Sequence, residues 1–307
     1  MSSGSVPLAR RRSGLLRQEA IDGYLFIGPW LVGFVIWIAG PMLFSLALVF
    51  LNWSLLTPPT FAGLDNFKTL LADGLFPTSL YNTAYYTFIF VPLHVTLALL
   101  VALALNLRIR LVGIFRTVYY LPSITPSVAS VMLWLWVFNP DFGLVNLALR
   151  RMHLPTSHWF ADPTWAKPAL IIMALWALGG AMIIFLAGLQ NVPQELYEAA
   201  SIDGAGYWSR FWGVTLPMLS PVIFFNLVVG IIGSFQIFTS VFIISGGQGG
   251  PSNSTLFLVL YLYQNGFVFF KMGYASLLAW ILFLIVLIFT GIQFLVAKRW
   301  VHYEGSF

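Results

Sequence analysis

The stretch YASLLAWILFLIVLIFTGIQFLVA, residues 274–297, contains no charged side chain. A helix needs about 20 consecutive apolar residues to cross the roughly 30 Å hydrocarbon core of a bilayer, and this stretch is long enough. The whole chain has the same character, because 59% of its residues are hydrophobic and 8% are charged. Soluble domains carry about 25% charged residues. The sequence therefore predicts an all-α protein that crosses a membrane several times.

Six apolar stretches have the length of a span and no charged residue. They are 24–51, 82–107, 117–138, 169–190, 219–245 and 274–297. A seventh apolar run, 256–270, is shorter and contains Asn265 and Gly266. We expect it to be an interfacial or re-entrant helix packed on the bundle, with a broken extension of the last span as the alternative. Residues 1–22 are predicted to be a cytoplasmic tail and 23–307 one transmembrane domain.

The basic residues predict the orientation, because Lys and Arg accumulate in cytoplasmic loops. With six spans and both termini in the cytoplasm, ten of the 15 Lys and Arg residues lie on the cytoplasmic side. These ten are Arg10, Arg11, Arg12, Arg17, Arg108, Arg110, Arg116, Arg210, Lys298 and Arg299, and the other five are Lys68, Arg150, Arg151, Lys167 and Lys271. Trp159 and Trp165 in the outer loops suit a membrane-interface belt. Topology thus explains the net charge of +5, with no nucleic acid as a partner.

Several kinds of chemistry are missing from the sequence. The chain has no cysteine, which excludes disulfides and thiolate metal sites. None of the ten acidic residues lies in a predicted span, which disfavours transport coupled to an ion gradient. No Lys follows a Gly, so the phosphate cradle of ATPases is absent, and no HExxH metal motif is present. We predict no catalytic residue, metal site or bound cofactor, and we interpret His94 as a hydrogen-bonded packing residue rather than a ligand or proton relay.

The stretch EAASIDGAGYWSRFWGVTLP, residues 198–217, is unusually polar for this chain. Asn191 is predicted to cap a short helix that ends near Ile202, where Asp203 and Gly204 form a turn. A second short helix is expected over 206–213, and Pro217 should end it before the next span. Composition alone leaves two interpretations open, a hairpin that lies on lipid headgroups and a hairpin that docks on a protein partner.

The order of residues in this stretch resembles a known family. Glu198-Ala199-Ala200, then Gly204, then Val214-Thr215-Leu216-Pro217 is similar to the EAA loop of permeases in binding-protein-dependent ABC importers. The family usually has Ile where this chain has Val214. The segments RTVYYLPSITPSVAS, FQIFTSVFIISGGQGGP, GYASLLAWILFLI and RWVHYE also resemble carbohydrate-uptake permeases of the maltose and glycerol-phosphate type.

This resemblance implies a function for the loop at 191–217. In the family the loop docks in a cleft of a separate ATPase subunit. Glu198 would pair with a basic group there, Ala199 and Ala200 would allow close approach, and Gly204 would form the turn. The remaining residues of the implied coupling set are Asp203, Arg210, Leu216 and Pro217.

The resemblance also implies partners and a location. We expect a non-catalytic permease subunit in a bacterial or archaeal cytoplasmic membrane, paired with a second, different permease. Two ATPase subunits would bind ATP and magnesium, and an extracytoplasmic solute-binding protein would deliver an oligosaccharide or related polyol.

Polar and small residues in two of the predicted spans are candidates for a substrate pathway. Asn226, Gly230 and Ser234 follow one another at intervals of four residues, on one face of a helix, and Gln236 is nearby. Trp176, Gly179 and Gly180 in the preceding span could supply a ring and space. The alternative is that small residues at this spacing serve close helix packing. Gln236 and Asn226 are the stronger pathway candidates.

Two other classes of function remain as alternatives. A secondary carrier or channel for small polar solutes is disfavoured because the predicted spans contain no carboxylate. An intramembrane enzyme is disfavoured because Cys, HExxH and a buried acid–base pair are all missing.

Overall fold

The computed structural model describes residues 9–107 and 110–302, with side chains from residue 16 onward in those ranges. The predictions about the side chains of Arg10, Arg11 and Arg12, about Arg108, and about the last residues of RWVHYE lie outside this description. Most of the described residues are helical, and two strands of two residues each pair antiparallel.

The elements follow one another in this order: α1 (Ala9–Phe34), η1 (Val35–Ala39), α2 (Gly40–Leu48), β1 (Leu51–Asn52), β2 (Thr60–Phe61), α3 (Asp65–Ala72), α4 (Leu75–Asn106), α5 (Val112–Ile124), α6 (Ser127–Val137), α7 (Leu144–Arg151), η2 (Trp159–Ala161), α8 (Ala166–Leu175), α9 (Gly179–Gln190), α10 (Gln194–Ile202), α11 (Tyr207–Arg210), η3 (Phe211–Thr215), α12 (Leu216–Phe235), α13 (Thr239–Ile244), α14 (Leu258–Tyr263), η4 (Gln264–Val268) and α15 (Met272–Ala297).

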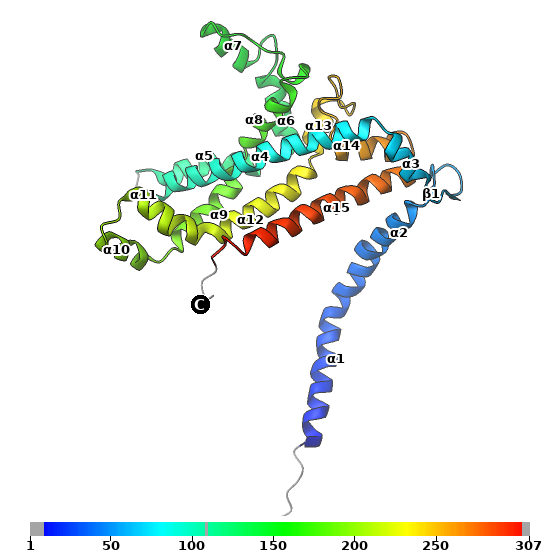
Figure 1. The fold of residues 1–307 in the computed structure, drawn as a ribbon, viewed down its shortest axis with the longest axis horizontal. Helices are drawn as coiled ribbons and strands as arrows, with labels where there is room; N and C mark the ends of the chain where they lie inside the picture. Colours follow the sequence, from blue (N-terminus) through cyan, green and yellow to red (C-terminus); the bar gives the residue numbers. More distant parts are fainter. Residues whose placement is uncertain (1–8, 108–109, 303–307) are drawn as a thin grey trace, which may run out of the picture.

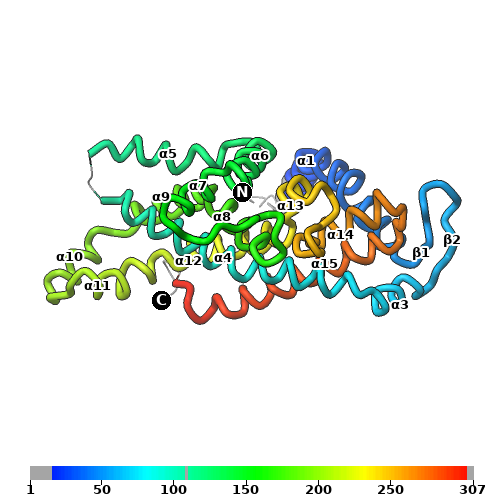
Figure 2. The backbone as a smooth tube through the Cα atoms, turned by 90° about the horizontal axis from the view of Figure 1, so that it is seen from above, coloured from blue at the N-terminus to red at the C-terminus, as the bar shows by residue number. Residues whose placement is uncertain are grey.

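The centre of the molecule is a bundle in which α4 packs against α9 and α12, and α12 packs against α15 (Figure 1). Its core is apolar, with Phe185, Phe235 and Leu278 almost completely buried. The helices α10 and α11 lie at one end of the bundle, and α3, β1 and β2 lie at the other in both views (Figure 2). We call these the hairpin end and the far end.

Three predicted spans are not single straight helices. The range 117–138 is divided into α5 and α6, which meet at an angle of 101°. Pro126 explains this break, because a proline disfavours the helical conformation of the residue before it, and Thr125 is extended. The range 169–190 is divided into α8 and α9, bent by 46°. The range 219–245 is interrupted after Phe235, and α13 begins at Thr239.

The other boundaries differ from the predicted ones by smaller amounts. Helix α1 begins at Ala9, so residues 9–22 are helical and continue into the first apolar stretch, and the assignment of 1–22 to a cytoplasmic tail stays a prediction. Helix α4 begins at Leu75, before the predicted 82. The run 256–270 forms the short elements α14 and η4, which pack on α15, and Leu258 is fully buried in the protein. The segment packs on the bundle as predicted, with its first half buried and residues 267–270 exposed, and its interfacial or re-entrant position stays a prediction.

The number of spans stays a prediction. By length and composition, four helices in the described residues can cross a membrane, and six can if each bent pair counts as one span. The first of them, Leu16–Leu48, has only 6% of its most apolar window buried. In Figure 1 helix α1 extends away from the bundle.

A small lobe connects α6 to α8. Asn146 on α7 is buried at its centre, donating hydrogen bonds to the carbonyl oxygens of Pro140 (2.9 Å) and Ser157 (2.8 Å). Its Oδ1 accepts a hydrogen bond from the indole N–H of Trp159 at 2.8 Å. The expectation that Trp159 lies in a membrane-interface belt is therefore wrong, because this ring is in the core of the lobe. Trp165 is more exposed.

Candidate functional site

The charged segment forms a helical hairpin that projects from one end of the bundle (Figure 1). Its first arm is α10 and its second arm is α11. Glu198, Ala199 and Asp203 are exposed, and Ala200 is partly covered. The residues of the EAA pattern thus lie on a surface that a partner can reach.

The tip of this hairpin has the hydrogen bonds of a glycine-terminated helix. The N–H of Gly204 donates to Ser201 O at 3.1 Å, and the N–H of Ala205 donates to Ala200 O at 2.9 Å. This pair of bonds needs the residue after the helix in the left-handed region, and Gly204 has φ +77°. A residue with a Cβ is strained at that φ, so the sequence pattern requires glycine here for a backbone reason.

Two local expectations about the hairpin are wrong. Asn191 ends α9 and does not cap α10, whose preceding residue is Pro193. The second arm does not stop at Pro217 either, because α11 passes through the π-helical turn η3 into α12. Leu216 and Pro217 are the first residues of α12, and Pro217 lies directly after the π-helical turn, whose last hydrogen bond runs from the N–H of Leu216 to Phe211 O.

Two side-chain contacts hold the arms of the hairpin together. Arg210 Nη1 donates to Ser201 Oγ at 3.1 Å, and the hydroxyls of Tyr197 and Thr215 lie 3.0 Å apart in a hydrogen bond. Arg210 was predicted to belong to the coupling set, and in the structure it braces the hairpin. Tyr197 and Ser201 were not identified from the sequence, although their spacing of four places them on one helix face. Thr215 was named only as part of the family pattern, without this contact.

The acidic groups of the hairpin have no basic partner within the described residues. The one ion pair found there joins Lys68 and Asp65, far from the hairpin. Glu198 Oε1 accepts only a hydrogen bond from Gln194 Nε2, at 3.1 Å. The exposed carboxylates of Glu198 and Asp203 are therefore available to a basic group on another protein.

The stripe predicted on α12 faces the neighbouring helix. A Cβ on Gly230 would lie 3.1 Å from the Val91 side chain of α4. Asn226 and Ser234 are buried, and each donates to a carbonyl of its own helix, Val222 O at 2.9 Å and Ile231 O at 3.0 Å. These contacts favour the packing interpretation for Gly230 and leave the pathway roles of the stripe a prediction.

The other pathway candidates differ in their access to open space. Trp176 lies in the break between α8 and α9, with its ring 6.0 Å from that of Trp134. Gly179 is a close-packing position, because a Cβ there would lie 2.3 Å from Tyr119 O. Gly180 has nothing within 4 Å of its Cβ position, and Gln236 is exposed where α12 ends. Gly180 and Gln236 thus border open space.

Within the described residues, neither His94 nor the acidic side chains form an arrangement for bound metal. The His94 ring packs against Phe90, with 5.1 Å between centroids, and no hydrogen bond accompanies this contact in the described part of the chain. Over residues 9–107 and 110–302, no three His, Asp or Glu side chains gather closely enough to hold an ion.

The part of the chain that contains the hairpin matches a known protein family. Residues 94–302 match the family described as "Binding-protein-dependent transport system inner membrane component". The chain belongs to this family. The matched region contains the whole hairpin and the helices α8 to α15. The resemblance predicted from the residues around Glu198 is therefore confirmed, and the chain is a multi-pass membrane permease of an ABC importer.

Individual relatives agree with this assignment. The permease is 43% identical to the probable ABC transporter permease protein YesP of Bacillus subtilis (strain 168), over 99% of each chain. It is 37% identical to the lactose transport system permease protein LacF of Rhizobium radiobacter, over 94% of this chain and 98% of LacF.

A solved structure has the same fold. One chain in the crystal structure of a bacterial alginate ABC transporter, in complex with an alginate pentasaccharide-bound periplasmic protein, superposes with a TM-score of 0.80. The two chains are 22% identical, and the match covers 92% of this permease and 96% of that chain.

Proposed function

We propose that this permease imports a carbohydrate, either an oligosaccharide or a related polyol, across the cytoplasmic membrane of a bacterium or archaeon. The similarity to LacF, a lactose transport system permease protein that aligns along nearly its whole length, supports a sugar as the substrate. The permease itself would catalyse no reaction. It would form the pathway together with a second permease.

The observation that carries this proposal is the exposed hairpin at 194–210. Its acidic side chains have no basic partner in the described chain, its tip is held by the turn at Gly204, and its second arm is continuous with α12. A partner that grips the hairpin can therefore move a helix of the bundle directly. We propose that this partner is a separate ATPase subunit that binds ATP and magnesium.

Two further partners complete the proposal. The apolar surface of α1, almost wholly uncovered by the rest of the chain, fits lipid on one side and a second permease on the other. The far end of the bundle would receive a solute-binding protein that carries the sugar. Both termini would then lie in the cytoplasm, as the distribution of Lys and Arg indicates.

The test begins with purification of the tagged permease in mild detergent, with mass spectrometry of the proteins that accompany it. The recovered complex and its solute-binding protein are reconstituted in liposomes. Uptake of lactose, maltose, trehalose and an arabino-oligosaccharide is then followed with ATP inside. We expect ATP-dependent uptake of at least one of these sugars, and recovery of an ATPase subunit and a second permease.

Two hairpin variants should uncouple uptake from ATP hydrolysis. Glu198→Lys reverses the charge that faces the partner, and Gly204→Pro cannot adopt the φ of +77° at the turn. We expect both to insert normally and to lose sugar uptake at least tenfold. Glu195→Lys and Gly206→Ala are the matched controls, because Glu195 lies outside the family pattern and Gly206 has a φ of −72° that alanine adopts.

Full transport by both Glu198→Lys and Gly204→Pro would refute the docking role of the hairpin. Uptake by the permease alone, driven by an ion gradient without ATP, would instead establish the secondary carrier as the correct alternative.

A further inference from the structure

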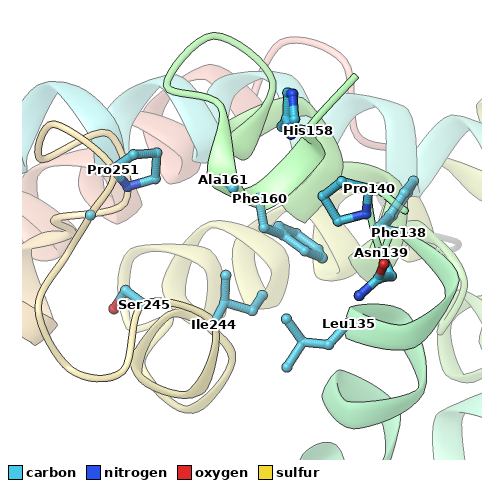
Figure 3. A pocket seen from close by; sticks show the side chains of 11 residues that line it. Leu135, Phe138, Asn139, Pro140, His158, Phe160, Ala161, Ile244, Ser245 and Pro251 are labelled. Atoms are coloured by element: carbon cyan, nitrogen blue, oxygen red, sulfur yellow. The ribbon is translucent and has the colours of Figure 1, made fainter. Parts of the chain in front are cut away.

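A cavity of about 490 Å³ lies where the lobe meets the loop after α13. Figure 3 shows its walls, which come from the end of α6, the turn η2, the end of α13 and the glycine-rich loop that follows. These elements are far apart in the sequence. The volume is within the range of about 300–1,000 Å³ that is typical of small-molecule sites.

The apolar part of the lining contains an aromatic ring. The ring of Phe160 points into the cavity, with Leu135 and Ile244 beside it (Figure 3). The position of this ring is fixed by its neighbours, since Phe138 packs edge-to-face against it at 5.4 Å between centroids, and Phe138 also packs on Trp159 at 4.8 Å. A sugar ring has an apolar C–H face that packs on such a surface.

The polar part of the lining retains unused hydrogen-bonding capacity. Asn139 Oδ1 accepts from the N–H groups of Asp141 (2.9 Å) and Phe142 (3.2 Å), which identifies the oxygen of the amide. The two N–H bonds of Nδ2 have no acceptor within the described part of the chain. Ser245 Oγ donates to Val241 O at 2.8 Å and keeps its lone pairs, and His158 is exposed at the rim.

The wall formed by the loop is held in place. Thr255 Oγ1 donates to Gly250 O at 2.6 Å, and Asn82 Nδ2 donates to the carbonyl oxygens of Asn253 and Leu256 at 2.8 and 3.0 Å. The cavity is therefore formed before any ligand binds, which lowers the entropic cost of binding.

Two helices connect the cavity to the predicted pathway. On α6, Trp134 lies one turn before Phe138, and its ring contacts Trp176. The indole N–H of Trp134 is buried without a hydrogen-bond partner in the described chain, and such a group has a strong tendency to find one. On the other side α13 follows the break that contains Gln236, and Ser245 is the first residue after this helix. The cavity thus lies one short helix away from both Trp176 and Gln236.

We infer that this cavity is a receiving site for one or two rings of a neutral sugar on the way to the pathway between the helices. The ring face would pack on Phe160, and the hydroxyls would accept from Asn139 Nδ2 and donate to Ser245 Oγ and His158. This inference rests on the proposed carbohydrate function and adds a binding site to it.

The direct test uses the absence of cysteine from the chain. Ser245→Cys introduces a unique thiol in the cavity, and Asp141→Cys introduces a control thiol in the neighbouring turn, outside the lining. The complete complex is placed in nanodiscs without binding protein or ATP, and maleimide labelling of the permease is timed with lactose and the other sugars of the uptake panel. At a sugar concentration ten times the dissociation constant, labelling of Ser245→Cys should slow about tenfold.

The control and a second position make the result decisive. Labelling of Asp141→Cys should not change with sugar, and His158→Cys at the rim serves if Ser245→Cys does not assemble. If the sugar that the wild-type complex transports protects neither Ser245→Cys nor His158→Cys, the receiving site is refuted and the carbohydrate function stands. If no sugar of the panel is transported, the proposed function fails, and labelling still reports whether the cavity binds a sugar.

A transport variant separates sugar binding from docking of the solute-binding protein. Asn139→Asp keeps the oxygen that accepts from the backbone and removes both N–H donors. We expect sugar uptake to fall several-fold, with no change in ATP hydrolysis stimulated by the binding protein or in the concentration of binding protein that half-saturates it. A rise in that concentration, with ATP hydrolysis and uptake falling together, would show that the cavity docks the protein and would overturn the inference.

Discussion

The side-chain amide of Asn82 joins three parts of the far end. It is 2% exposed, and its Oδ1 accepts from Lys167 Nζ at 2.8 Å while its Nδ2 donates to the two carbonyls of the glycine-rich loop. The ammonium of Lys167 also lies over the rings of Tyr81 and Tyr85, at 5.1 and 5.2 Å. One amide on α4 therefore positions both α8 and the loop.

Replacing this amide should destabilise the permease. Asn82→Leu leaves two carbonyls and one ammonium group without a partner, and each such loss costs about 1–3 kcal/mol. We expect the Tm of the purified protein in detergent to fall by several degrees.

The matched control is Gln236→Leu, because this exposed amide makes no hydrogen bond in the described chain. Its Tm should equal that of the wild type, while sugar uptake should weaken if Gln236 lines the pathway. An unchanged Tm for Asn82→Leu would contradict the role assigned to Asn82.

At the scale of elements, the hairpin and α12 form one mechanical unit. Two contacts join the arms, Arg210 to Ser201 and Tyr197 to Thr215, and no loop separates the second arm from α12. The contact between Tyr197 and Thr215 is at the base of the hairpin, since Thr215 is the last residue of η3. Loss of this contact should loosen the hairpin without altering the surface that carries Glu198.

Tyr197→Phe tests whether the contact between Tyr197 and Thr215 keeps the hairpin rigid. Removal of one hydroxyl costs about 0.5–1.5 kcal/mol, so the hairpin should still bind the ATPase subunit but transmit its motion less completely. The ratio of sugar imported to ATP hydrolysed, measured in liposomes, should fall.

Tyr207→Phe is the control, because no described residue forms a hydrogen bond with the exposed Tyr207 hydroxyl. If Tyr197→Phe keeps the wild-type ratio of sugar imported to ATP hydrolysed, the contact between Tyr197 and Thr215 has no part in coupling.

At the scale of the whole molecule, Asp73 closes the far end of the bundle. Its carboxylate accepts hydrogen bonds from the hydroxyls of Tyr261 on α14 and Tyr274 on α15, and from the N–H of Leu75 at 2.9 Å. Burial raises the pKa of Asp73, but the hydrogen bonds from Tyr261, Tyr274 and the backbone outweigh it, and the pKa is lowered. Burial, together with the bond to Asp73, raises the pKa of Tyr261 to about 12.

These shifts set the pH range in which the cluster stabilises the fold. Because the folded pKa of Asp73 is below its ordinary value of 3.8, its contribution is present above that value and is lost as the pH falls through the folded pKa. Because the folded pKa of Tyr261 is raised from 10.0, its contribution is present below pH 10.0 and is lost as the pH rises through about 12.

Asp73→Asn should therefore lower the Tm by a constant amount between about pH 5 and 8, and this difference should shrink toward pH 3. Thermal unfolding across this range measures it. Asp65→Asn removes a carboxylate of an exposed ion pair, which is worth about 0–1 kcal/mol, and should have little effect. A difference for Asp73→Asn that grows as the pH falls would refute the assignment.

Part of this structure can be predicted directly from the sequence. Uncharged apolar stretches mark the long helices, and the residues around Glu198 and Gly204 mark the hairpin and its turn, because backbone requirements appear locally. Pro126 also signals the break between α5 and α6, although the apolar stretch around it hides the bend. The family is confirmed, whereas the six spans and the substrate pathway stay predictions.

Contacts between distant residues could not be predicted in this way. Asn82 and Lys167 are 85 positions apart, and Asp73 and Tyr274 are 201 apart, so no local pattern links them. The cavity at Asn139 and Ser245 was missed for the same reason. Its walls come from segments that meet only when α13 packs on α6.

The helical stretch that runs without a loop from α11 through η3 into α12 can act as a lever. At about 1.5 Å per residue, the helical stretch 207–235 is roughly 40 Å long. A tilt of about 5° applied at one end displaces the other by roughly 3.5 Å, which exceeds the length of a hydrogen bond of about 2.9 Å. An angular movement of this size, applied at the hairpin, would therefore be enough to carry Gln236, the residue that follows the other end of this stretch, over the distance that separates one hydrogen-bonding position from the next.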